Sequence, residues 1–171
     1  FLFLSILFFS FNSYSTSVVV INIEKIINEN ESYIKEINKI ELSQKKYLDE
    51  FKIKEIKLDK KIQEIENSKL ILEESEINNL ILNYNNELNE YNDLIDKFNT
   101  HYNNQIINIR NIILEELIIL IEKYIKNNNI ELVLDSNNYL IASNAINITI
   151  EIANDLKKVT LNLDFIDFEK N

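Results

Sequence analysis

The sequence contains no Gly, Pro, Cys, Met or Trp among its 171 residues. Without glycine, the chain cannot form the phosphate-binding loops of nucleotide-binding proteins or the tight turn of an EF-hand, because both need glycine backbone. Without cysteine, it has no disulfide, no thiolate nucleophile and no zinc-thiolate site. These absences exclude most familiar enzyme signatures. The sequence therefore predicts no catalytic residue, no cofactor and no metal site.

Charge and apolar content indicate a folded, acidic protein. The formal net charge is -10, 46% of the residues are hydrophobic and 27% are charged, so the chain does not have the composition of a disordered protein. Its 28 Asn and 32 Ile are typical of coding bias in an AT-rich genome. The length fits one domain, with or without an extension. The acidity argues against nucleic acid as a partner, because that binding relies on neutralising phosphates.

Residues 1–17 are uncharged and begin with an apolar run of about eleven residues, followed by small polar residues. A membrane-spanning helix needs about 20 apolar residues, so this run is too short to cross a bilayer. Small residues at alternating positions, such as Ser13 and Ser15 or Ser15 and Ser17, are typical of a signal-peptide cleavage region. We interpret residues 1–17 as an N-terminally clipped secretory signal peptide; the alternative is a buried N-terminal strand.

Two long stretches have apolar residues at helical spacing. They cover residues 24 to about 70 and about 73 to 126, and the second keeps this spacing for about seven heptads, as a coiled-coil seam does. Between them the apolar phase slips, and Ser and Asn precede a run of acids, which indicates a reversal with Ser68 or Ser75 near the next helix start. The prediction is an antiparallel helical hairpin that forms an arm over residues 24–127.

Short strands are predicted on both sides of the arm. Residues 18–21 are β-branched and residues 130–135 are rich in Leu and Val, as strands are. Residues 139–142 are predicted to be a third strand, in a hairpin with residues 130–135 around a turn at residues 136–138. Asn127, Asn128 and Asn129 stand in for the glycine that commonly ends a helix.

The predicted fold is mostly α with a small β body, in the order strand, helix, helix, strand, strand, helix. The last helix starts at about Thr149, and the alternating residues from Val159 onward form an extra edge strand or a tail. The predicted division is residues 1–17 as signal peptide, 18–158 as one domain with its body at 18–23 and 128–158, and 159–171 as a C-terminal extension.

Both flanks of the arm resemble the Skp (OmpH-like) family of periplasmic chaperones. The opening Val-Val-Val-Ile-Asn-Ile-Glu-Lys-Ile-Ile-Asn-Glu-Asn (residues 18–30) is similar to that family's entry segment, where a strand leads into a helix. Tyr-Ile-Lys-Asn-Asn-Asn-Ile-Glu-Leu-Val-Leu-Asp (124–135), Asn-Tyr-Leu-Ile-Ala (138–142) and Ile-Asn-Ile-Thr (146–149) are similar to its closing signature. The resemblance spans residues 18–158. Asn147 departs from it, since the family commonly has Asp there.

The resemblance implies a jellyfish-shaped homotrimer in the periplasm that holds unfolded outer-membrane proteins in a cavity between its arms, without ATP. It implies membrane contact that is at most peripheral. Two or three short strands cannot bury both faces in a monomer, which also favours an oligomer. The residues expected in the trimer body are Val18, Val19, Val20, Ile21, Leu132, Val133, Leu134, Tyr139, Leu140 and Ile141.

A locally basic stretch of the arm is the second candidate site. Its lysines could contact acidic clients or lipid headgroups, although a solvated helix face with intrahelical ion pairs is the weightier interpretation. The client-contact candidates are Lys52, Lys54, Lys57, Lys60 and Lys61. His101, the only histidine, is expected to face solvent. Two other functions stay open: a structural coiled-coil spacer or adaptor of the cell envelope, and a prefoldin-like chaperone, in which the strands would lie between the helices.

Overall fold

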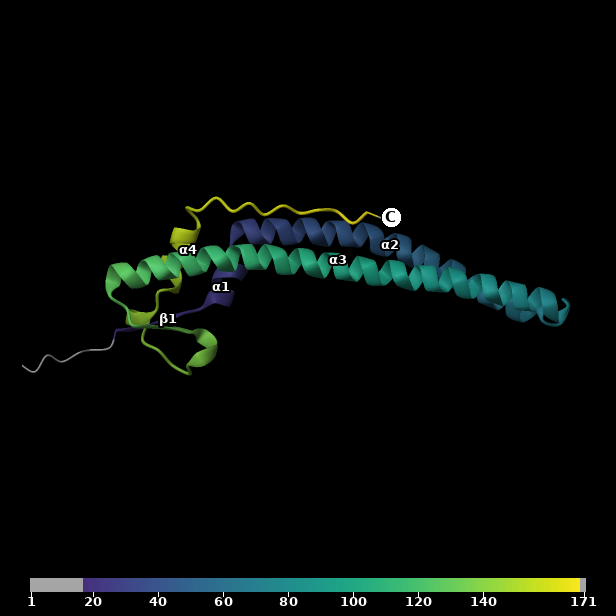
Figure 1. Ribbon diagram of the computed structural model, residues 1–171, viewed down its shortest axis with the longest axis horizontal. Coiled ribbons are helices and arrows are strands. Elements are labelled where there is room, and N and C mark those ends of the chain that lie inside the picture. Colours follow the sequence, from purple (N-terminus) through teal and green to yellow (C-terminus); the bar gives the residue numbers. More distant parts are fainter. Residues whose placement is uncertain (1–16, 170–171) are drawn as a thin grey trace, which may run out of the picture.

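The computed structural model describes residues 17–169, and the predicted signal peptide therefore lies almost wholly outside the described residues. A long hairpin of two helices projects from a small body (Figure 1). The hairpin consists of α2 (Glu31–Ser68) and α3 (Glu74–Asn128). The body contains β1 (Val18–Ile21), α1 (Ile23–Asn28), β2 (Leu132–Asp135), the 3-10 turns η1 (Ser136–Asn138) and η2 (Asn144–Ile146), and α4 (Thr149–Leu156).

The predicted seam between the two long helices is confirmed. The residues at helical spacing pack against one another, and the buried ones are Ile40, Tyr47, Phe51, Leu58 and Ile65 on α2 and Ile77, Phe98, Tyr102, Ile109, Ile113 and Leu117 on α3. The reversal at residues 69–73 is also confirmed, and Ser75 lies near the start of α3 as predicted, as its second residue. Glu73 precedes α3, and its backbone N–H donates to the Glu76 carboxylate at 3.2 Å.

The prediction of one unbroken helix from residue 24 was wrong. α1 ends at Asn28, and α2 begins after Asn30, whose side chain accepts a hydrogen bond from the Tyr33 N–H at 3.0 Å. Asn side chains compete with the helix for backbone N–H groups and favour cap positions. The break places α1 in the body and leaves α2 and α3 as the arm.

The strands pair differently from the prediction. β1 and β2 are parallel, with Val18 opposite Leu132 and Ile21 opposite Asp135, and the predicted third strand at residues 139–142 does not form. Asp135 explains the difference, because its carboxylate accepts from the Ile23 N–H at 3.1 Å and from the Asn137 side chain at 2.9 Å. These bonds start a 3-10 turn at Ser136–Asn138, the residues that were predicted to form the hairpin turn.

The chain after α4 does not form the extra edge strand that its alternation suggested. Residues 159–169, here called the C-terminal strap, are extended and run back along the α2–α3 hairpin (yellow in Figure 1). Leu163 and Phe168 of the strap are buried in the same apolar core as Tyr47, Phe98 and Tyr102. The strap therefore behaves as a tail that packs on the arm.

The asparagine triplet ends α3 as predicted. Asn129 has φ 51° and ψ 44°, the left-handed conformation, and its N–H donates to the carbonyl of Ile125. The N–H of Ile130 donates to the same carbonyl at 3.1 Å. Asparagine is one of the few non-glycine residues that adopt this conformation at low cost, so the chain turns from α3 into β2 without glycine.

We expect Asn129→Ala to lower the free energy of unfolding by about 1 kcal/mol, because alanine disfavours the left-handed conformation. Asn129→Gly should keep or raise it, since glycine adopts this conformation freely. Urea unfolding followed by circular dichroism measures both. The matched control is Asn127→Ala inside α3, where alanine favours helix. Equal losses at positions 127 and 129 would contradict this explanation.

Candidate functional site

The residues predicted for the trimer body fall into two groups. Val19, Val20 and Ile21 of β1 are already buried within the single chain. The others are partly or fully exposed: Val18, Leu132, Val133, Leu134, Tyr139, Leu140 and Ile141. Leu140 is 100% exposed and Ile141 is 92% exposed. The apolar surface that the body presents to solvent therefore comes from β2 and the loop after it, and only marginally from β1.

Two further features extend this surface. Tyr139 and Ile150 line the same shallow cavity, and Ile150 is 72% exposed, although the predicted set did not include it. Both edges of β1 are occupied. One edge pairs with β2, and on the other the Val20 carbonyl accepts a hydrogen bond from the Ile148 N–H at 2.9 Å. Within residues 17–169, β2 pairs with no strand except β1. One β2 edge and the apolar loop beside it are thus open to a partner.

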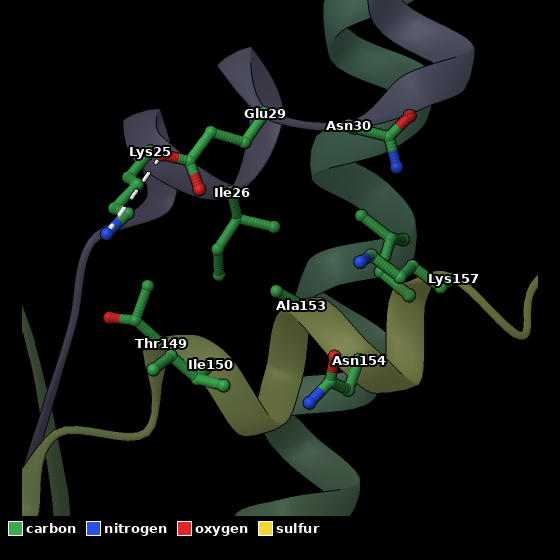
Figure 2. Close-up of a pocket in the computed structure, with 10 residues that line it drawn as sticks. Lys25, Ile26, Glu29, Asn30, Thr149, Ile150, Ala153, Asn154 and Lys157 are labelled. Atoms are coloured by element: carbon green, nitrogen blue, oxygen red, sulfur yellow. Dashed lines mark ion pairs between the residues drawn. The ribbon is translucent and has the colours of Figure 1, made fainter.

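A cavity of about 300 Å³ lies between α1 and α4 (Figure 2). Ile26 of α1 and Ala153 of α4 form its apolar wall, and Lys157 lies at its rim. Lys25 and Glu29 form an ion pair of 4.0 Å along α1 beside it. No converging set of charged groups faces this cavity among the residues described. We interpret it as the packing space between two short helices.

The five predicted lysines do not form one site. Lys54, Lys57 and Lys61 line a groove of about 490 Å³ on the arm, whose apolar residues are Phe51, Ile53, Leu58 and Leu94. Lys52 and Lys60 are exposed but do not line it. The groove also contains acids: Glu87 pairs with Lys61, and Glu50 lies at the edge. Lys54 lies over the ring of Tyr91, 5.9 Å from its centre.

An aromatic cluster under the C-terminal strap is the most elaborate contact on the arm, and sequence reasoning did not anticipate it. The Phe168 ring lies 5.4 Å from that of Tyr47, 5.5 Å from that of Phe98 and 5.6 Å from that of His101, between ring centres. The Phe165 ring stacks on Tyr102 at 6.3 Å. Such pairs each add about 0.5–1.5 kcal/mol beyond the burial of apolar area. Phe168 thus anchors the end of the strap.

Polar contacts hold the same end of the strap. The hydroxyls of Ser43 and Tyr102 both donate to the Asp167 carboxylate, the second at 3.1 Å, and the Tyr47 hydroxyl donates to the Phe168 carbonyl. The hydrogen bond from Ser43 is the main reason that the pKa of Asp167 lies below its usual value. Partial burial of Asp167 acts in the opposite direction and raises its pKa. Burial raises the pKa of Tyr102, which stays a protonated donor at neutral pH.

His101 faces solvent only in part, because it also contacts the strap. His101 Nε2 lies 2.8 Å from the carbonyl oxygen of Ile166 in the strap, and the Ile166 N–H donates to the Gln105 side chain at 3.4 Å. The imidazole also packs edge-on against Tyr102 at 5.1 Å. His101 therefore serves to bind the strap.

The described residues hold no group of three or more His, Asp or Glu that could bind a metal ion. Adjacent acids such as Glu115 and Glu116 diverge by about 100° around a helix, so they do not converge on a substrate. None of the helices in the described part of the chain is long and apolar enough to cross a membrane.

Strap docking should weaken in acid. Docking lowers the pKa of Asp167. The contribution of this carboxylate to the stability of docking is therefore complete above the undocked pKa of about 3.9, and it is lost as the pH falls through the lower pKa of the docked strap. A spin label on Asn162→Cys, unique in this cysteine-free chain, should be immobile at pH 7 and become mobile below pH ~4. The same label in Asp167→Asn should lack this transition. An unchanged transition in that variant would show that another group controls docking.

Comparisons with known proteins agree with this architecture. The sequence profile of the family described as "Outer membrane protein (OmpH-like)" matches residues 17–156. The chain also resembles a crystal structure from Caulobacter crescentus CB15, of a protein thought to be an OmpH-like outer membrane chaperone, with a TM-score of 0.63 and 11% sequence identity over 90% of this chain and 93% of the other. A search of curated proteins found no match. The chain belongs to the OmpH-like family, as its sequence predicted.

Proposed function

We propose that this protein is an ATP-independent chaperone of the periplasm that binds unfolded outer-membrane β-barrel proteins and prevents their aggregation. Membership of the OmpH-like family supports a chaperone role, and the Caulobacter crescentus protein with the same fold is described as an outer membrane chaperone. The uncharged apolar run at residues 1–11, followed by small polar residues, supports export from the cytosol.

The single observation that carries the proposal is the pairing of a long arm with an open apolar body. A two-stranded sheet is marginally stable alone, and one edge of β2 is available to another chain. Beside it lie Leu140 and Ile141, which are almost fully exposed. Soluble monomers seldom expose contiguous apolar patches without a partner. We propose that three copies join through this surface, so that three hairpins surround a common cavity.

The arms suit the handling of unfolded clients. Each carries scattered exposed apolar residues, such as Leu42, Leu48 and Leu82, among charged ones, rather than one deep pocket. Contacts of this kind are individually weak. Several arms around one client raise its effective concentration, so total affinity increases while each contact still opens quickly. Such a chaperone binds without strict sequence specificity and releases without a nucleotide cycle.

The mature chain should be a trimer by light scattering, and it should keep a urea-denatured β-barrel protein soluble after dilution. Turbidity measures this second property, and added ATP should not change it. A monomer that leaves aggregation unaffected would refute the proposal. A trimer without any effect on aggregation would instead favour the spacer or adaptor role.

A matched pair of variants tests the body surface. Leu140→Asp with Ile141→Asp should raise the dissociation constant of the trimer about tenfold or more, because carboxylates would be buried in an apolar interface. The chain offers its own control at the arm tip, where Leu70 and Ile71 form the same dipeptide at 93% and 84% exposure. Leu70→Asp with Ile71→Asp should stay trimeric. Dissociation by both pairs, or by the tip pair alone, would contradict the assignment.

A further inference from the structure

The seat of the strap and the lysine-lined groove lie along one side of the arm. On α2, Ser43 and Tyr47 contact the strap, and the groove residues Glu50, Lys54, Lys57 and Lys61 follow at steps of three or four. On α3, Gln105, His101 and Phe98 contact the strap, and the groove residues Leu94 and Glu87 follow at steps of four and seven. Residues at these spacings share one face of a helix. The two sites therefore form one furrow.

Phe51 joins the two halves of this furrow. Its ring lies 4.9 Å from that of Phe98, which contacts Phe168 of the strap, and Phe51 itself lines the groove. The strap occupies the half nearer the body, where it ends at the Phe168 anchor. The groove is the half nearer the arm tip, and no residue of the described strap lines it.

From Val159 to Phe165 the strap docks by a period-two pattern, which ends where Ile166 and Asp167 are both exposed and Phe168 is buried. Leu161 and Leu163 point toward the arm, and Phe165 is half-buried, whereas the alternate residues Asn162 and Asp164 are exposed. Its hydrogen bonds to the hairpin are concentrated at Ile166, Asp167 and Phe168. Alternating apolar and polar residues over about ten positions is also the pattern of a strand in a transmembrane β-barrel. The furrow thus holds a segment in which residues 159–165 alternate as such a strand does.

We propose that this furrow is a binding track for one extended client segment with apolar residues at alternating positions and acidic residues among them, and that the C-terminal strap is the intramolecular occupant that such a segment displaces. The inference rests on the proposed chaperone function and specifies the segment that it recognises. The strap lies beyond residues 17–156, which the family profile matches.

Charge supports an acidic occupant. The described strap carries Asp164, Asp167 and Glu169, although Lys170 follows it in the sequence and the whole chain is acidic. Its Asp167 is held by two hydroxyls and lies close enough to Lys46 for attraction. Beyond the strap, the groove offers Lys54, Lys57 and Lys61 against Glu50 and Glu87. An acidic segment longer than the strap would therefore meet a local excess of positive charge.

One buried group on the same stripe of α2 lacks a full set of partners. Glu36 precedes Ile40 and Ser43 at steps of four and three, and it is buried. One carboxylate oxygen pairs with Lys39 at 2.7 Å, whereas the other has no hydrogen-bond partner among the described residues. Buried acceptors are normally satisfied. A donor on an incoming client segment would satisfy this acceptor if the segment reached it.

A strap that can be locked tests the proposal in the full chain. Ser43→Cys with Asp167→Cys places the only two thiols at a side-chain contact between arm and strap. The probe is a fluorescent peptide of the strap's length in which Leu and Phe alternate with Asn and Asp. The reduced protein should bind it, and the oxidised protein should bind it about tenfold or more weakly, because affinity falls with the fraction of open track. A peptide of the same composition with its apolar residues in one block should bind poorly to both forms.

Each outcome is decisive. Equal binding by the reduced and oxidised forms would show that the peptide does not use the strap's seat and would overturn the proposal. A disulfide that links two chains would show that the strap serves a second copy, which would also overturn it. If the protein without substitutions does not keep a client from aggregating, the proposed chaperone function itself is refuted instead. Normal holdase activity with equal peptide binding would refute the track alone.

The predicted lysines provide a charge-matched test of the open half. Lys54→Glu with Lys57→Glu reverses two groove lysines, whereas Lys52→Glu with Lys60→Glu makes the same change in net charge outside the groove. At physiological salt, where charges beyond about 8 Å are screened, the groove pair should weaken binding of a longer acidic peptide to the reduced protein about tenfold, and the other pair should leave it nearly unchanged. Equal effects of both pairs would show that net charge, and not the groove lysines, controls binding of the peptide.

Discussion

β1 and β2 pair in parallel although the whole helical arm separates them in sequence. Parallel strands need a long crossover, and here the α2–α3 hairpin is that crossover, so its two ends are held side by side at the base. Hydrogen bonds reinforce this closure: Ile23 N–H donates to Asp135, and Asn22 N–H donates to Thr149 at the start of α4. These bonds determine where α4 lies and on which side of the arm the strap begins.

A hairpin of two helices buries one seam and leaves its outer faces in water. Along one face this chain adds a third layer, the strap, which turns Tyr47, Phe98 and Tyr102 from a groove lining into a core. Where the strap ends, the same face continues as a groove with apolar residues and lysines. The two halves of this face are built alike, and they differ only in whether the strap fills them. This continuity makes the strap informative about what the open half can bind.

Local sequence patterns predicted the long helices and their ends well. Contacts between residues far apart in the sequence could not be predicted. The seam from Ile77 to Leu117 and the left-handed Asn129 both follow from short-range rules of spacing and capping. Leu140 and Ile141 have the composition of a strand, but Asp135 diverts the chain into a turn, and that contact depends on Ile23 far away in the sequence. The strap's alternation is equally ambiguous, because nothing local distinguishes an edge strand from a segment that packs on helices. For the same reason, five neighbouring lysines suggested one patch, whereas helix geometry distributes them over different faces.

Net charge and local charge act at different distances on the proposed track. The chain carries -10 overall, but the groove half of the furrow contains three lysines against two glutamates. At physiological salt, charges are screened beyond about 8 Å, so a segment lying in the groove experiences its lysines more than the distant acids. An acidic client is then attracted only once it is close, and it is repelled by the chain as a whole at low salt. Binding of this kind is short-ranged and weak at each contact, as the proposed release of clients without ATP requires.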